Sequence, residues 1–208
     1  TVLSTRNMSL SELCRTGISR LHQATSTGTT VIEATSGYGL KTESELKLLK
    51  AIDTINDSSP VKLLPTWLGA HDFSRGCTRG EYLEELINSQ LPAVVEQGIA
   101  RWADVFCENG WYSNDETETI VRAAAEQGLP ARLHVDELED SGGLALAAEL
   151  GSISGDHVAK SSVESRQAAS DNGTMQTFLP GTPYVLGKPL DLPLGQCIET
   201  VPSPQLTL

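Results

Sequence analysis

A histidine and a glutamate three residues apart follow an apolar run near the middle of the chain. The run at 131–135 contains His134, and Glu137 lies just beyond it. A histidine at the end of a buried strand can bind a metal ion, and a glutamate slightly further on can move a proton for a water bound to that metal. The spacing therefore indicates a hydrolytic metal site, although a packed core histidine and a surface glutamate would give the same pattern.

A second histidine ends the next apolar segment. His157 comes 23 residues after His134 and directly follows Asp156. Two strand-end histidines from successive βα units are what a hydrolytic metal site at the mouth of a barrel requires. A catalytic metal normally takes three or four protein ligands, so the spacing alone gives an incomplete site.

Two further side chains are candidates in earlier loops. Tyr38 lies between Gly37 and Gly39, which favour a tight loop, and its hydroxyl could bind a substrate carboxylate or amide. His71 follows Gly69, a glycine that could let the backbone turn toward a ligand. Each also has a simpler interpretation: a loop ring folded over apolar neighbours for the tyrosine, and an ordinary loop histidine for the other.

An alternation of helices and strands must position these residues. Apolar, β-branched runs predict strands, and apolar residues at helical spacing predict the helices between them. The strands are expected at 29–34, which should be buried, and at 61–66, 104–107, 131–135, 153–155 and 175–179. The helices are expected at 9–26, 42–55, about 80–97, 113–128, 143–150 and about 161–171. A long loop containing Gly69 should follow the second strand, and Thr42–Glu45 and Ser113–Glu116 match the capping-box pattern.

Apolar strands joined by helices predict a parallel sheet covered on both faces. Six such units fit an open doubly wound sheet or an incomplete barrel, and no GxGxxG motif supports the former. The polar residues favour the barrel, because they fall at or just after the carboxyl ends of different strands. They are Tyr38, His71, Glu108, His134, Glu137 and His157. The sequence thus predicts an α/β fold, an incomplete (β/α)8 TIM barrel of the metal-dependent hydrolase type at 1–187, followed by a Pro-rich irregular tail at 188–208.

Composition narrows the class of protein further. The 208 residues carry a formal net charge of -12, which disfavours nucleic acid or an anionic membrane as a partner. No run is apolar enough to span a bilayer, and no secretory leader is recognisable at the start. The four cysteines are widely spaced, without a CxxC pair, so we expect free thiols in a reducing cytoplasm. They are Cys14, Cys77, Cys107 and Cys197.

Several runs taken together resemble the imidazolonepropionases of the amidohydrolase superfamily. They are GTTVIEATSGYGL at 28–40, LPTWLGAH at 64–71, DVFCENGWYS at 104–113, LPARLHVDELEDSGG at 129–143, LGSISGDH at 150–157 and FLPGTPYVL at 178–186. Their order and spacing match the family over about residues 1–187, as barrel strands two to seven. SGYG, LGAH and the LH…SGG…DH series are specific in combination.

The resemblance implies hydrolysis of the ring amide of 4-imidazolone-5-propanoate, a small molecule, to N-formimino-L-glutamate in histidine degradation, with one Zn2+ or Fe. It implies that His134 is a metal ligand, that Glu137 positions or deprotonates the attacking water, that His157 lies beside the metal and the scissile carbonyl, and that Tyr38 and His71 contact the substrate. The family's strand-one HxH pair and strand-eight aspartate are absent from this sequence, so His134 alone remains of the expected protein ligands.

Two other interpretations stay open. The first is a catalytically incomplete barrel fragment that self-associates as a homo-oligomer through open sheet edges. The second is a related cyclic amidohydrolase or deaminase with a different ring substrate. The SGYG and LGAH loops argue against the second, because they match the substrate side of imidazolonepropionases.

Overall fold

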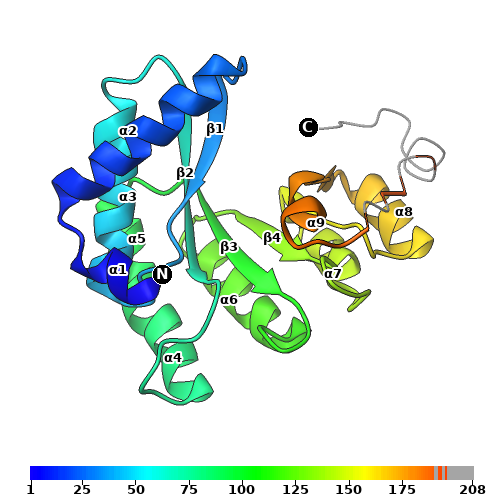
Figure 1. Ribbon diagram of the computed structural model, residues 1–208. Coiled ribbons are helices and arrows are strands. Elements are labelled where there is room, and N and C mark those ends of the chain that lie inside the picture. Colours follow the sequence, from blue (N-terminus) through cyan, green and yellow to red (C-terminus); the bar gives the residue numbers. More distant parts are fainter. Residues whose placement is uncertain (190–191, 194, 196–208) are drawn as a thin grey trace. The chain divides into compact units, whose positions relative to one another are not determined.

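The computed structural model describes residues 1–189, 192–193 and 195, and the chain divides into two compact units. The first unit contains residues 1–104 and 123–129, and the second contains residues 105–122 and the described residues from 130 onward. Each unit combines strands with helices, as Figure 1 shows along the chain. The predicted alternation of helices and strands is therefore confirmed.

The strands pair in parallel and in chain order. They are β1 (Val31–Thr35), β2 (Lys62–Ala70), β3 (Trp102–Cys107), β4 (Ala131–Val135), β5 (Ser154–His157) and β6 (Met175–Thr177). Their order in the sheet is β1-β2-β3-β4-β5-β6, with parallel registers between β1 and β2, β4 and β5, and β5 and β6. Parallel strands in chain order with helical connections are the pattern of a (β/α)8 barrel, here with six of its strands among the described residues.

The helices connect these strands. They are α1 (Val2–Asn7), α2 (Leu10–Ser26), α3 (Thr42–Asn56), α4 (Arg79–Glu85), the π-helical turn η1 (Leu86–Gln90), α5 (Leu91–Gln97), α6 (Asn114–Glu126), α7 (Gly143–Glu149), α8 (Val163–Asn172) and α9 (Gly181–Val185). The helix predicted at 80–97 is thus α4, η1 and α5 in succession. The sequence did not predict α1 or α9.

The core of the first unit lies between β2 and helices α3 and α5. Leu49 of α3, Trp67 of β2 and Leu91 of α5 are almost completely inaccessible to solvent. The strand predicted at 29–34 exists as β1, but the prediction that it is buried is wrong, since Val31 is 51% exposed. The reason is its place as the first strand in the sheet order, which gives β1 a strand neighbour on one side only among the described residues.

In the second unit, β4, β5 and β6 pack against α7 and α8. Leu133 of β4 and Leu144 of α7 are fully buried, and Gly155 of β5 faces both elements. A Cβ added at Gly155 would lie 2.7 Å from Cδ1 of Leu144, so the glycine permits α7 to approach the sheet closely. This packing places the carboxyl ends of β4 and β5 side by side.

The second strand is longer than predicted. Gly69 lies inside β2 and does not begin a loop. A Cβ at this position would lie 2.5 Å from Nε1 of Trp67 and 2.7 Å from Oε1 of Gln90. The glycine therefore serves close packing in a strand, and the prediction that it turns the backbone before His71 is wrong.

Other expectations concern the tail, the membrane and the thiols. Most of the tail predicted at 188–208, Cys197 included, lies outside the described residues. In the part of the chain that the structure describes, no helix has the length and apolar character needed to cross a membrane. Cys14, Cys77 and Cys107 are free thiols, as predicted.

The free thiols differ in their chemistry. Cys77 is exposed, whereas burial raises the pKa of Cys107 to about 11. Because the thiolate is the reactive form, we expect an alkylating reagent at pH 8 to label Cys77 more than tenfold faster than Cys107. Mass spectrometry of timed samples measures both rates, and labelling in denaturant should abolish the difference. Equal rates in the native protein would contradict this burial of Cys107.

Candidate active site

Three of the predicted site residues lie together at the carboxyl ends of β4 and β5. His134 belongs to β4, Glu137 lies in the turn after it, and His157 is the last residue of β5. Oε2 of Glu137 lies 3.6 Å from Nε2 of His157, and the ring centroids of the two histidines are 5.1 Å apart. The parallel register pairs Val135 with His157, which brings the two strand ends to one level.

The protonation states of this group follow from its burial. Burial lowers the pKa of His157 to about 4, and the nearby His134 lowers it further while Asp156 opposes the shift. The imidazole of His157 is therefore neutral at pH 7, so its contact with Glu137 is not an ion pair. Burial also raises the pKa of Glu137, with Glu108 adding to the shift and His134 opposing it. A carboxylate whose pKa moves toward neutrality is better suited to accept and return a proton.

Backbone conformations at these strand ends are unusual. Asp136, His157 and Val158 have φ angles of 51°, 77° and 43°, in the left-handed region that non-glycine residues rarely adopt. Such conformations cost roughly 1–2 kcal/mol per residue and concentrate at functional sites. Two backbone bonds hold the strained turns together: Val158 N–H donates to Val135 O, and Lys160 N–H donates to Asp136 O, each at 3.1 Å.

A cavity of about 180 Å³ lies against this group in the second unit. Its lining includes Glu137 and His157 together with Lys160, Lys188 and apolar side chains such as Leu179. A mixture of apolar walls with a few polar and charged groups is typical of small-molecule sites. Two ammonium groups in the lining favour a ligand that carries negative charge.

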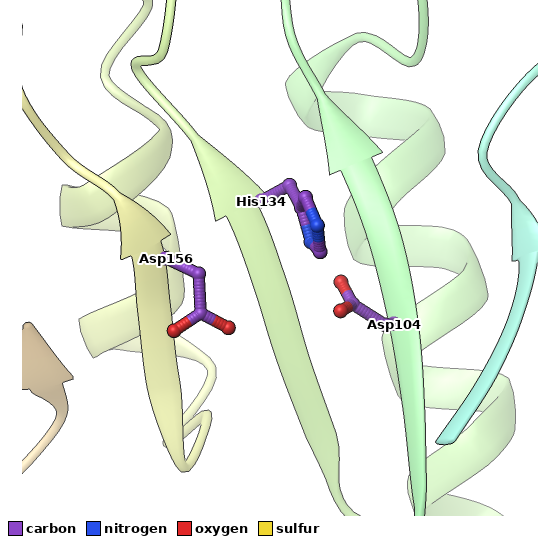
Figure 2. Close-up of side chains that lie close together, drawn as sticks. All are labelled: Asp104, His134 and Asp156. Carbon is purple, nitrogen blue, oxygen red and sulfur yellow. The ribbon is translucent and has the colours of Figure 1, made fainter. Parts of the chain in front are cut away.

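His134 also belongs to a group of side chains that could hold a metal ion. Asp104 of β3, His134 and Asp156 each offer one ligand atom, and these atoms lie within 4.8 Å of one another (Figure 2). An imidazole with two carboxylates suits Zn2+ or Fe. However, Nη2 of Arg132 lies 3.3 Å from Oδ1 of Asp156, and Ser154 Oγ donates to Oδ2 of the same carboxylate. A cation at this group would compete with Arg132 for Asp156.

The remaining two predicted residues form a pair in the first unit. Tyr38 lies in the loop after β1, and His71 directly follows β2. Their ring centroids are 4.7 Å apart, and the side chain of Tyr38 is 43% exposed. Gly37 has a φ of 103°, so the tight loop predicted from the glycines around Tyr38 is confirmed.

A buried glutamate holds the loop that carries Tyr38. Glu45 of α3 accepts the backbone N–H groups of Gly37 at 2.7 Å, Gly39 at 2.8 Å and Leu40 at 2.7 Å. The capping box predicted at Thr42–Glu45 is wrong, because the N-cap residue of α3 is Lys41 and no side chain caps the helix. The carboxylate of Glu45 accepts hydrogen bonds from the loop instead of capping the helix.

Comparison with known proteins adds to this geometry. No family model matches the chain. The imidazolonepropionase of Alkaliphilus metalliredigens is 41% identical over 193 residues, which are 89% of this chain and 44% of that protein. The imidazolonepropionase of Haloarcula marismortui is 41% identical over 160 residues, 77% of this chain and 38% of that protein. The chain belongs to the imidazolonepropionase family. It spans less than half the length of these curated relatives.

Solved structures agree with this assignment at the level of the fold. Adenine deaminase from Arthrobacter aurescens has a TM-score of 0.70 at 14% identity, covering 92% of this chain and 60% of that chain. The 5-methylcytosine deaminase from Klebsiella pneumoniae has a TM-score of 0.65 at 12% identity, covering 86% and 45%. Identities this low show the fold alone.

Three buried carboxylates near the site were not predicted to take part in it, although Glu108 was among the strand-end polar residues that favour a barrel. Asp104 belongs to the candidate metal group, Glu108 binds the turn that carries Glu137, and Asp136 binds the segments around it. One signal could have identified Asp104: a carboxylate inside a buried strand is costly unless it has partners or a cation. The other two bind mainly backbone N–H groups, which a sequence does not reveal.

Proposed function

We propose that this chain carries part of the active site of an imidazolonepropionase, which hydrolyses the ring amide of 4-imidazolone-5-propanoate to N-formimino-L-glutamate in histidine degradation. The observation that carries the proposal is the close contact of Glu137 with His157 beside His134, in a chain 41% identical to imidazolonepropionases. The lysines of the adjacent cavity suit an anionic small-molecule substrate. The free thiols support a reducing compartment, the cytoplasm.

In this proposal each side chain has one task. Glu137 accepts a proton from the attacking water and returns it to the ring nitrogen as the C–N bond breaks. His157, neutral at pH 7, donates a hydrogen bond to the carbonyl oxygen as negative charge develops there. Tyr38 and His71 contact the substrate.

His134 is the proposed metal ligand, with Asp104 and Asp156 as the neighbouring donors that could share it. A Zn2+ or Fe ion held by these residues would lower the pKa of a water molecule and polarise the substrate carbonyl. The donor set fits such an ion, but Arg132 beside Asp156 weakens the fit, and we expect the isolated chain to bind metal weakly.

The test combines an assay with elemental analysis on the same sample of the 208-residue chain. Turnover of 4-imidazolone-5-propanoate that increases with added Zn2+ or Fe2+ is the expected result. Adenine and cytosine serve as matched ring substrates, and we expect no ammonia release from either. Turnover of a nucleobase without turnover of the imidazolone would overturn the proposal in favour of a deaminase.

A second candidate is a non-catalytic fragment that self-associates. The half-exposed Val31 on the first strand, with Leu10 and Ile18 exposed on α2, favours this alternative. Light scattering over a range of concentrations tests it. A stable monomer that turns over the imidazolone would exclude the second candidate, whereas concentration-dependent oligomers without turnover or bound metal would favour it.

A further inference from the structure

We propose that Glu108 is a positioning residue that fixes the turn carrying Glu137 and so aims the carboxylate of Glu137 at the reacting atoms. The anchoring of the turn by Glu108 is inferred from the geometry of the second unit alone. The effect of this anchoring on catalysis rests on the proposed function.

The turn after β4 needs an anchor. Residues 136–139 form bends, with neither strand nor helix hydrogen bonding. Asp136, which begins the turn, has the strained φ of 51°. A proton-transferring group must hold its geometry within about 0.5 Å, which a short irregular segment cannot do without outside contacts.

Glu108 supplies such a contact directly at Glu137. Its Oε2 atom accepts the backbone N–H of Glu137 at 2.8 Å and that of Leu138 at 3.1 Å. The side chain is only 2% exposed, and hydrogen bonds to a buried carboxylate are stronger than those between neutral groups. One carboxylate oxygen therefore accepts hydrogen bonds from two successive backbone amides, and one of these amides belongs to Glu137, the proposed proton-transferring residue.

The anchor is itself held rigidly. Glu108 directly follows β3, and its backbone N–H donates to the carbonyl of Tyr112 at 3.2 Å. The N–H of Trp111 donates to the carbonyl of Glu108 at 2.9 Å, which closes a tight turn. The position of the Glu108 carboxylate is thus set by a strand end and a hydrogen-bonded turn, both within the second unit.

Asp136 has a different and wider task. Its carboxylate accepts the N–H and Oγ–H of Ser141, the N–H groups of Gly143 and Leu144, and the Oγ–H of Ser161. It joins the start of α7 to the segment after β5, so its loss would disturb both. The carboxylate of Glu108 accepts backbone N–H groups of the turn at residues 137–139, which makes Glu108 the selective probe of that turn.

Amide hydrogen exchange in the 208-residue chain tests the anchoring without any need for turnover. In Glu108→Ala, exchange at the amides of Glu137 and Leu138 should rise by about tenfold or more, because both lose a charge-assisted bond. Glu108→Gln keeps an acceptor oxygen but loses the charge, so we expect a smaller, roughly several-fold rise in exchange. Glu139→Gln is the matched control, since it removes an exposed carboxylate from the same turn and should leave both amides unchanged.

Unchanged exchange in a folded Glu108→Ala variant would overturn the anchoring, as would an equal rise in Glu139→Gln. If Glu108→Ala does not fold, Glu108→Gln carries the test: its neutral oxygen should give a roughly several-fold rise confined to the amides of this turn, and no rise would count against the proposal.

Kinetics on 4-imidazolone-5-propanoate test the catalytic meaning. Glu108→Ala should lower kcat by about tenfold or more with KM within about twofold, and Glu108→Gln should recover part of kcat. Loss of protection at the two amides with an unchanged kcat would overturn the positioning role. Absence of turnover in the unsubstituted chain would count against the proposed function instead, while the exchange result would still decide whether Glu108 anchors the turn.

Discussion

Replacing Glu137 by glutamine is expected to lower kcat on 4-imidazolone-5-propanoate by at least about 100-fold, the usual scale for the loss of a general acid/base group. Glutamine has nearly the same shape but cannot accept and return a proton. Because the substrate contacts of the site remain, KM should change little. Steady-state kinetics at several substrate concentrations separate the two constants.

We expect the loss of activity in Glu137→Gln to occur without a loss of folding stability. Burial raises the pKa of Glu137, which means that the folded chain disfavours its charged form. The neutral glutamine should therefore leave the melting temperature unchanged or slightly raised. The control is Glu139→Gln, which should keep near-normal turnover. Glu139 lies in the same turn, but its side chain is exposed and accepts a hydrogen bond from Asn109. If Glu137→Gln also keeps near-normal turnover, Glu137 has no part in the mechanism.

The spatial proximity of His134, Glu137 and His157 could be predicted because it follows from the topology of the sheet. Successive parallel strands end at the same edge, and the register that pairs Val135 with His157 brings their side chains together. The sequence predicted β4 with its observed bounds, since its apolar run is short and clearly limited. Local pattern and global fold agree there.

The residues that support the site were harder to predict, because their partners are backbone groups. Asp136 lies next to Glu137 and in sequence looks as polar as Glu139, yet it is fully buried and Glu139 is exposed. The difference arises from N–H groups of α7 and a hydroxyl after β5, which only the folded chain brings near. The role of Gly69 was predicted wrongly for a similar reason. The side chains of Trp67 and Gln90 occupy the space that a Cβ at this position would need, and only the folded chain brings Gln90 there.

Glu45 illustrates how a correct element can conceal a wrong interaction. The pattern at Thr42–Glu45 correctly placed the start of α3 but assigned Glu45 to a capping box at the helix end. In the structure Glu45 instead satisfies three buried amides of the loop that carries Tyr38. We therefore expect Glu45→Ala to lower the free energy of unfolding by about 3 kcal/mol or more, because each buried N–H left without an acceptor costs about 1–3 kcal/mol.

Glu43 provides the matched control for this prediction. It lies in the first turn of the same helix, carries the same charge and is exposed. An acidic side chain that acts only on the helix dipole contributes about 0.3–1 kcal/mol, so Glu43→Ala should have an effect within that range. Urea unfolding followed by tryptophan fluorescence, to which the buried Trp67 contributes, measures both variants. Equal, small losses would mean that Glu45 acts at the helix end after all, whereas a large loss for Glu45→Ala alone, with faster exchange at the amides of Gly37 and Gly39, would establish it as the support of the Tyr38 loop.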